Sequence, residues 1–403
     1  MMATTNDDAA RRSIWVIIFG LFMIAVGTSL VVPFFTIYLR EKLGLTAMQI
    51  GMALTAKLVS SYGLTMVGGI LSDRYGARAT MTVGLLIRAF SYVGIATATG
   101  LGSVVAWSVV MGIGGALYLP ASKTAMATLA GNQEKVKLFS MRNTANNLGV
   151  SIGPLLGVLA LFGNARLLFY VAALTYVLFA FLTMFLVSPS PGERAVKARP
   201  LNWRIFTWLA FDVRMLYLEF IIGFFMFLYV QMELTMPLHA KTHFGNWAVS
   251  LLFTVNAVTV VCLQVPLSTF LSRRLAASVT VTLGLIGMAL GLLLMALSHT
   301  LPVFLVAIVI FTMGEVTIDP RVDAETSDMV PPGTIGTALG ILGAMNAVGG
   351  TLGNIVGGAI YSRAADAGTA GDYWIWLGVA AVVGAVLVLI VGSLLEAPVE
   401  ESQ

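Results

Sequence analysis

Three carboxylic acids stand four residues apart within a strongly apolar stretch of this chain. Glu315, Asp319 and Asp323 all lie between residues 301 and 325. If this stretch is helical, the spacing places the three carboxyl groups along one helix face. A carboxylate among apolar groups is costly unless it faces water, pairs with a base or remains protonated. The pattern therefore predicts uptake and release of a proton, with Glu315, the deepest acid, as the first candidate and Asp319 as the second.

Another acid stands near one end of a second apolar stretch. Gln231 and Glu233 precede a proline in residues 214–238. Glu233 is a candidate for binding a proton or a cationic substrate, and the alternative is an interfacial acid that reaches water. Asp319 also has a structural alternative, which is an ion pair with Arg321 or Lys123.

Two bases interrupt apolar stretches in the first half of the chain. Lys57 lies about a third of the way along one stretch, and Arg88 lies near the middle of the next. Each either takes part in the mechanism or forms a structural ion pair. Several tyrosines and the glutamine named above are candidates to line a substrate cavity. These candidates are Tyr38, Tyr62, Tyr118, Tyr229 and Gln231.

The sequence gives no sign of a metal site, a redox centre or an enzyme. Cys262 is the single cysteine, and the three histidines fall at expected helix ends or loops without metal-ligand spacing. No nucleophile, base or metal constellation indicates catalysis. We therefore expect no cofactor and no enzymatic activity.

Composition places these residues in a membrane. Of 403 residues, 58% are hydrophobic and only 10% are charged, which is too apolar for a protein surface in water. The net charge of +4 gives no nucleic-acid signal. Twelve apolar stretches are long enough to span a bilayer, which indicates an all-α membrane protein. The expected spans are residues 14–39, 47–71, 79–99, 103–126, 138–162, 165–188, 214–238, 247–272, 277–298, 301–325, 334–361 and 373–395.

The distribution of basic residues predicts the orientation. With both termini in the cytoplasm, most bases in the connections also fall there, as the positive-inside rule requires. The region 189–213 carries Arg194, Lys197, Arg199 and Arg204 among Ser, Pro and Gly, which indicates a flexible cytoplasmic linker. We expect a multi-pass protein of the cytoplasmic (inner) membrane.

The two halves of the chain are related at a spacing of 200 residues. Asn146, Gly149, Gly153 and Gly157 recur as Asn346, Gly349, Gly353 and Gly357, and Gly114 and Pro120 recur as Gly314 and Pro320. Because six spans separate the copies, both halves have the same orientation, which is a parallel repeat. The expected domains are a six-helix bundle at 1–188, the linker at 189–213 and a six-helix bundle at 214–403.

Two motifs resemble the major facilitator superfamily. Residues 69–78, which include Gly69, Asp73, Arg74, Gly76 and Arg78, resemble the family's signature loop, with Ala77 as the only departure. Gly149, Gly153, Pro154 and Gly157 resemble its antiporter-type helix motif, although a packing-only role is the alternative. The family's arginine in the fourth span is absent, because Ser108 stands there.

The resemblance implies a major facilitator fold of twelve helices, with alternating access to a central cavity. It implies that the loop at Asp73 is a conformational latch and that the helix carrying Glu315 lines the cavity. The expected function is proton-coupled export of small amphipathic or cationic compounds, as in multidrug efflux. The partners would be a small-molecule substrate, protons and the lipid bilayer, with no nucleic acid and a monomer as the working unit. The alternative is a carrier for one metabolite, such as a sugar, an amino acid or a biosynthetic product.

Overall fold

The expected apolar stretches form helices. The computed structural model describes residues 2–130, 135–160, 165–189, 209 and 211–396. The chain is divided into two compact units, and only the first unit contains residues from both halves of the sequence. The first comprises Met1–Thr207 and Thr326–Ala344, and the second comprises Trp208–Glu325 and Met345–Gln403.

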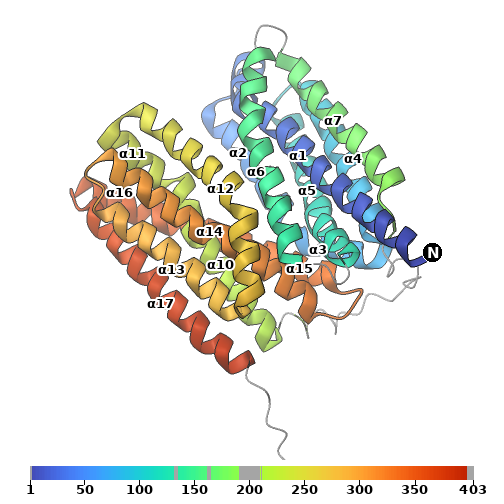
Figure 1. The fold of residues 1–403 in the computed structure, drawn as a ribbon. Helices are drawn as coiled ribbons and strands as arrows, with labels where there is room; N and C mark the ends of the chain where they lie inside the picture. Colours follow the sequence, from blue (N-terminus) through green and yellow to red (C-terminus); the bar gives the residue numbers. More distant parts are fainter. Residues whose placement is uncertain (1, 131–134, 161–164, 190–208, 210, 397–403) are drawn as a thin grey trace, which may run out of the picture. The chain divides into compact units, whose positions relative to one another are not determined.

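The first unit is built from the helices of the first repeat, together with the end of one helix of the second repeat and the beginning of the next. Helix α1 packs along α6 and α7, and α4 packs against α5 and α7 (Figure 1). The helices are α1 (Met2–Leu43), α2 (Ala47–Gly63), α3 (Thr65–Tyr75), α4 (Ala77–Ala96), α5 (Leu101–Leu129), α6 (Lys135–Ala160), α7 (Ala165–Leu186), the end of α14 (Leu301–Met329) and the first turns of α15 (Ile335–Leu352).

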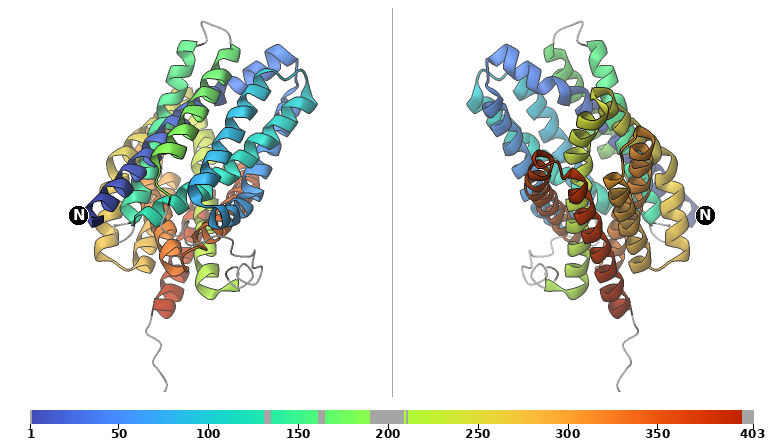
Figure 2. Two further views of the ribbon diagram at one scale, coloured as in Figure 1. Left: turned by 90° about the vertical axis from the view of Figure 1, so that its right-hand side faces the viewer. Right: turned by 90° about the vertical axis from the view of Figure 1, so that its left-hand side faces the viewer.

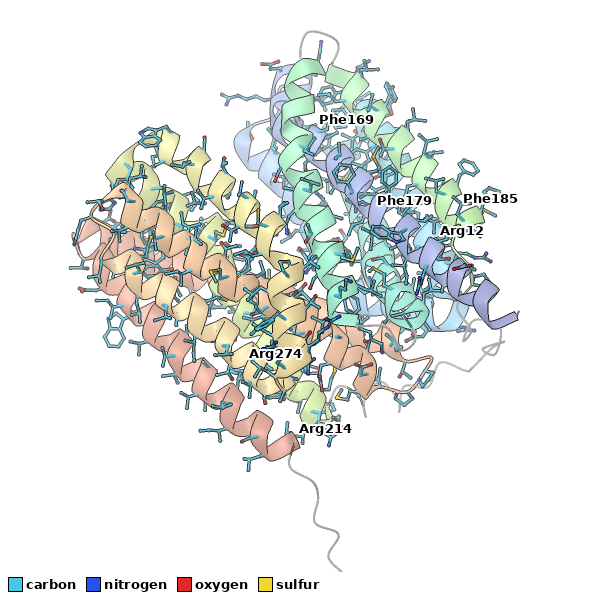
Figure 3. The ribbon with its side chains drawn as sticks, in the orientation of Figure 1. Arg12, Phe169, Phe179, Phe185, Arg214 and Arg274 are labelled. Atoms are coloured by element: carbon cyan, nitrogen blue, oxygen red, sulfur yellow. The ribbon has the colours of Figure 1, made fainter. Side chains whose placement is uncertain are left out.

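Aromatic side chains fill the interface between α1 and α7. A Cβ atom at Gly20 would overlap the ring of Phe179, so the absent side chain makes room for it. Further along the same pair of helices, the rings of Tyr38 and Phe169 lie 4.8 Å apart. All three phenylalanines labelled in Figure 3, which are Phe169, Phe179 and Phe185, belong to α7. Small residues on one helix and large rings on the other thus bring the two helices together.

The second unit contains the remaining helices (Figure 2). Helix α13 packs along α17, α11 along α12, and α10 against α17 and the segment η1. The elements are α10 (Val213–Glu233), α11 (Thr235–Phe244), α12 (Asn246–Arg274), α13 (Ala277–Ala296), the rest of α14, the rest of α15, η1 (Gly353–Gly357), α16 (Gly358–Asp366) and α17 (Ala370–Glu396).

Ten segments of the described chain are long and apolar enough to cross a membrane, or eleven when the bent pair α2–α3 is included. Helix α6 is the remaining long rod, and its first turns carry bases and asparagines. Counting each broken helix as one segment, six long helical segments of the described chain thus precede residue 190 and six follow residue 208. This agrees with the expected all-α architecture. Residues 190–208 and 210, which hold most of the expected linker at 189–213, lie outside the described residues. The division of the chain at 188 stays a prediction.

Three expected spans contain breaks. The span from 47 is bent by 44° at Leu64, where Gly63 weakens the helix and the Thr65 hydroxyl donates back to the Tyr62 carbonyl. The span from 214 breaks at Leu234, and Pro237 stands in the first turn of α11, where no backbone donor is needed. The third break is the π-helical turn Gly353–Gly357.

Candidate functional site

The carboxyl group of Glu315 is held by a hydrogen bond from a neighbouring helix. Asn256 of α12 donates its Nδ2 to Glu315 Oε2 at 3.3 Å. The same nitrogen lies 3.0 Å from Thr312 Oγ1 and 3.2 Å from the sulfur of Met232. Because Thr312 and Glu315 stand one turn apart on α14, one amide orients both side chains. Asn256 therefore fixes where the carboxyl group of Glu315 points.

The structure brings the three predicted proton-coupling candidates together. Glu233, the last residue of α10, and Asp319, one turn further along α14, are both close enough for their charges to act on Glu315. Glu233 also shares a hydrogen bond with Tyr229. Ionised carboxylates that lie within electrostatic range of one another repel each other. The cluster is therefore suited to hold and exchange a proton.

Of the other charged residues toward the end of α14, Asp323 lies on the same face as Glu315 and Asp319, whereas Arg321 and Glu325 lie on another face. Asp323 is buried, with 1% of its surface exposed. Arg321 pairs with Glu325 at 3.5 Å, one turn further along the helix. Arg321, which the sequence suggested as an alternative partner for Asp319, thus forms an ion pair with Glu325.

Gln231 lies at the centre of a closed polar network and is fully buried. Its Nε2 donates to the carbonyl oxygens of Phe227 and Gly353 at 2.9 and 3.0 Å. Its Oε1 accepts hydrogen bonds from Thr235 at 3.1 Å and Tyr373 at 2.7 Å. All four hydrogen-bonding positions of the amide are used. Gln231 therefore joins α10 to the π-helical turn η1, instead of presenting a free amide to a ligand.

The tyrosines singled out as cavity candidates have different surroundings. Tyr38 is buried, donates to the Ala96 carbonyl at 2.9 Å and accepts from Arg166 at 3.4 Å, so it ties α1 to the end of α4. Tyr118 is buried in the first unit. Tyr62 and Tyr229 are half-buried. Their contact with a substrate stays a prediction.

Asp73 caps a helix that belongs to the other sequence repeat. Its Oδ1 accepts the backbone N–H of Gly336 at 2.8 Å, and its Oδ2 accepts the N–H and the hydroxyl of Thr337, both at 2.7 Å. These N–H groups belong to the first turn of α15 and have no partner within the helix. Gly69 and Gly336 allow this approach, because a Cβ atom at Gly69 would overlap the Gly336 carbonyl. A carboxylate thus meets the positive end of a helix.

The remaining residues of the signature loop shape the turn. Gly76 ends α3 with φ of +93°, a conformation that strongly favours glycine. Arg74 is exposed and lies 5.2 Å from the ring centroid of Tyr75. Arg78 donates to the Val187 carbonyl at 3.5 Å, which links the start of α4 to the end of α7. Asp73 is therefore the member of this loop with the closest contacts to the second repeat.

The glycines of the antiporter-type motif lie against another helix backbone. A Cβ atom at Gly149 would come within 2.6 Å of the Phe22 carbonyl oxygen, and one at Gly153 within 2.8 Å of the Val26 carbonyl oxygen. Helices α1 and α6 thus touch backbone to backbone over two turns. The surroundings of Pro154 and Gly157 lie outside what the structure describes.

The corresponding glycines of the second repeat, Gly349 and Gly353, also lie against another helix backbone. A Cβ atom at Gly349 would overlap the carbonyl of Gly223, and one at Gly353 would come within 2.7 Å of the Phe227 carbonyl oxygen. The α10–α15 pair therefore repeats the α1–α6 pair. In the second unit, the third glycine, Gly357, packs against the side chain of Gln231 within the π-helical turn.

The two intramembrane bases flank α5. Gly112 packs against the backbone of Lys57, and a Cβ atom at Gly114 would come within 2.6 Å of Arg88 Cγ. The two charges are close enough to repel each other. The structure thus assembles Lys57 and Arg88, which the sequence places 31 residues apart, in one region of the first unit.

Two contact residues were missed by the sequence reasoning. Asn256 is an amide in an apolar stretch, and such a residue is a recognised sign of helix-to-helix contact in membranes. Thr337 follows the sequence Pro331-Pro332-Gly333, which marks a helix start but gives no indication of a distant capping acid. Among the described side chains, no group of three or more His, Cys, Asp or Glu residues is placed to hold a metal ion.

Comparison with known proteins gives one consistent family. A family model described as Major Facilitator Superfamily matches residues 17–248 and 234–403. Multidrug resistance protein MdtH of Aeromonas hydrophila is 26% identical over 375 residues, covering 92% of this chain and 93% of that protein. The uncharacterized MFS-type transporter YqjV of Bacillus subtilis is 27% identical over 353 residues, covering 85% of each chain.

Solved structures show the same fold. The human organic anion transporter MFSD10 (TETRAN) superposes with a TM-score of 0.76 at 17% identity, covering 94% of this chain and 99% of that one. The proton:xylose symporter XylE gives a TM-score of 0.74 at 16% identity, covering 95% of each chain. With the matched family model, the all-helical fold and the signature loop around Asp73, these findings show that the chain is a transporter of the major facilitator superfamily.

Proposed function

We propose that this transporter is a proton-coupled exporter of small amphipathic or cationic compounds, of the multidrug efflux type. The observation that carries the proposal is the cluster of Glu315, Glu233 and Asp319 with the orienting amide of Asn256. The relatives named multidrug resistance proteins support the substrate class. The cluster supplies a proton-exchange site among apolar side chains, which is the chemical requirement of proton coupling.

In this mechanism the transporter alternates between inward-open and outward-open states. Protons enter the cluster from outside and leave to the cytoplasm, while the compound moves outward. A charge that crosses the membrane gains about 2.3 kcal/mol per 100 mV, which is the energy available for accumulation. We place the transporter in the cytoplasmic membrane as a monomer with both termini inside, as the positive-inside rule favours.

The carboxylate–helix contact of Asp73 is proposed to stabilise one of the two states. It joins the last turn of α3 to the first turn of α15, so its formation depends on where the start of α15 lies. The glycine faces of α6 and α15 are proposed to support the same movement, because backbone contacts without interlocking side chains allow two helices to shift together.

The test replaces the central carboxyl group without changing its shape. Glu315→Gln retains the size of the side chain and can still accept the hydrogen bond from Asn256, but it cannot release a proton. We expect gradient-driven efflux of a fluorescent amphipathic cation from proteoliposomes to fall to background. Counterflow, which needs binding and alternation alone, should persist.

The matched control is Asp366→Asn, which neutralises an exposed acid at the end of α16 in the same unit. It should leave both efflux and counterflow unchanged. Full gradient-driven efflux by Glu315→Gln would refute the assignment and direct attention to Asp319 and then Glu233. A panel of sugars, amino acids and amphipathic compounds in the same vesicles would separate a multidrug exporter from a carrier for one metabolite.

A further inference from the structure

The interior of the first unit collects basic groups around one buried tyrosine. Tyr118 of α5 is 1% exposed, and its hydroxyl contacts Ser122 without the geometry of a hydrogen bond. The guanidinium groups of Arg88 on α4 and Arg142 on α6 both lie within electrostatic range of it. Lys57 of α2 lies within range of Arg88. We call Lys57, Arg88, Tyr118 and Arg142 the basic cluster.

Hydrogen-bonding capacity in the basic cluster is left unused. The guanidinium of Arg88 lies 4.9 Å from the ring centroid of Tyr176 and shares a hydrogen bond with Tyr92, yet its Nε has no partner. Arg142 is 7% exposed, donates through Nη1 to Asn143 at 3.3 Å and likewise leaves its Nε without a partner. Two buried guanidinium N–H groups and a tyrosine hydroxyl therefore have no hydrogen-bond partner among the described residues.

No described carboxylate of the first unit balances these charges. Its described acidic side chains are four in number: Asp8 and Glu41 are exposed, Asp73 caps α15, and Asp328 pairs with Lys135. Buried cations without a counter-charge are strongly unfavourable. Cations within membrane spans commonly mark the path of a substrate or an ion. The absence of a counter-charge among the described acids of the first unit is the feature that requires an explanation.

The chemistry of the groups defines what would bind. Guanidinium and ammonium groups only donate hydrogen bonds, and they match the oxygen atoms of a carboxylate, sulfonate or phosphate. The rings of Tyr92 and Tyr176, whose centroids lie 5.4 Å apart, add apolar surface beside Arg88. The combination favours a ligand with an anionic group on an apolar body.

We propose that the basic cluster binds the anionic group of an amphipathic cargo, so that the transported compounds include organic anions. This inference rests on the proposed export function and narrows its substrate class. The Glu315 cluster then serves protons, and the basic cluster serves the cargo. Acids and bases thus have separate roles in the two units.

The binding test uses three probes that share an apolar body and differ in charge. These are 1-pyrenebutyrate, 1-pyrenebutanol and 1-pyrenebutyl-trimethylammonium, added to the full chain in phosphatidylcholine nanodiscs. Energy transfer from tryptophan to pyrene reports binding. We expect pyrenebutyrate to bind at least about tenfold more tightly than pyrenebutanol, because a charge-assisted contact is stronger than a neutral one.

Variants assign that preference to the cluster. Arg88→Gln and Lys57→Gln should each weaken pyrenebutyrate binding about tenfold or more and leave pyrenebutanol binding within about twofold. Arg40→Gln removes an exposed base at the end of α1 and should change neither. Equal losses for the anion and the alcohol would show a purely structural role and overturn the proposal. If Arg88→Gln fails to fold, binding of the two probes by Lys57→Gln provides the test, because Lys57 is only half-buried.

Flux measurements separate this inference from the proposed function. If the wild type moves the alcohol or the ammonium probe in proteoliposomes but neither binds nor moves pyrenebutyrate, the anion site is refuted and export stands. If no probe of any charge moves, the export proposal itself fails. Adding phosphatidylglycerol to the nanodiscs tests a lipid headgroup as the occupant. Loss of pyrenebutyrate binding there would assign the site to lipid and overturn its role in cargo binding.

Discussion

Replacing Asp73 by asparagine tests whether the carboxylate at the start of α15 controls the transport cycle. The carboxylate accepts three hydrogen bonds, of 2.7 to 2.8 Å, from Gly336 and Thr337. Asparagine offers one oxygen and one NH2 group. Whichever way the amide turns, its NH2 group faces a backbone N–H, so at least one bond is lost together with the charge.

The size of the effect follows from those contacts. A hydrogen bond to a charged group contributes about 1.5–3 kcal/mol, and a charge at a helix end about 0.3–1 kcal/mol. The variant should therefore weaken the contact by about 2–4 kcal/mol. At about 1.36 kcal/mol per factor of ten, the equilibrium between the closed and open forms of this contact shifts about 30- to 900-fold toward the open form.

Cysteine accessibility measures this shift. Thr65 is 3% exposed, and its side chain packs on Gly343 of α15. In a background with the exposed Cys262 replaced by serine, Thr65→Cys should react with a hydrophilic maleimide only when α3 and α15 separate. Asp73→Asn should raise the labelling rate by about the same 30- to 900-fold while the contact is mostly closed.

Glu41→Gln is the matched control, since it also converts an acid to an amide but at an exposed position on α1. It should leave the labelling rate unchanged. An unchanged rate in Asp73→Asn, with unchanged transport, would refute the reasoning and reduce the contact to a local helix cap.

The remaining predictions concern packing and topology. Gly349→Ala places a Cβ atom against the Gly223 carbonyl and should destabilise the protein by about 1–3 kcal/mol, seen as a lower thermal unfolding midpoint in detergent. Gly350→Ala meets only ordinary contacts at 3.5 Å or more and should be neutral, so equal losses would contradict the backbone-contact argument. Reporter fusions after Arg199 and after Gln403 should both give a cytoplasmic signal, because bases concentrate on that side. An external signal from either fusion would exclude the proposed orientation.

Much of the fold could be predicted because the bilayer limits the alternatives. Backbone groups in lipid must bond within their own segment, so each long apolar stretch has to be a helix. Breaks inside those helices were harder to predict. The bend at Leu64 needs a hydroxyl that bonds back to its own helix, and the π-helical turn needs the amide of Gln231 from another helix. A local hydropathy pattern contains neither contact.

The candidate site likewise combines features that the sequence predicts with features that depend on tertiary contacts. The spacing of Glu315 and Asp319 places them on one helix face, and that alone made them candidates. Glu233, which the sequence named separately, lies near these two acids only because α10 and α14 fold together. Asn256 contacts Glu315 only because α12 lies beside α14. Both relationships link residues that are distant in the chain.

The sequence by itself determined the helices, their two-fold repeat, the superfamily motifs and the presence of costly charges within apolar spans. These properties are local or periodic, and the physics of the bilayer makes them readable along the chain. Only the tertiary structure decided which charges meet. It set Asp73 on the first turn of α15, brought Arg88 and Arg142 near Tyr118 and Lys57 near Arg88, and gave Glu315 its neighbours. Electrostatic and hydrogen-bond energies depend on distances of a few ångströms between helices, and the order of residues does not contain those distances.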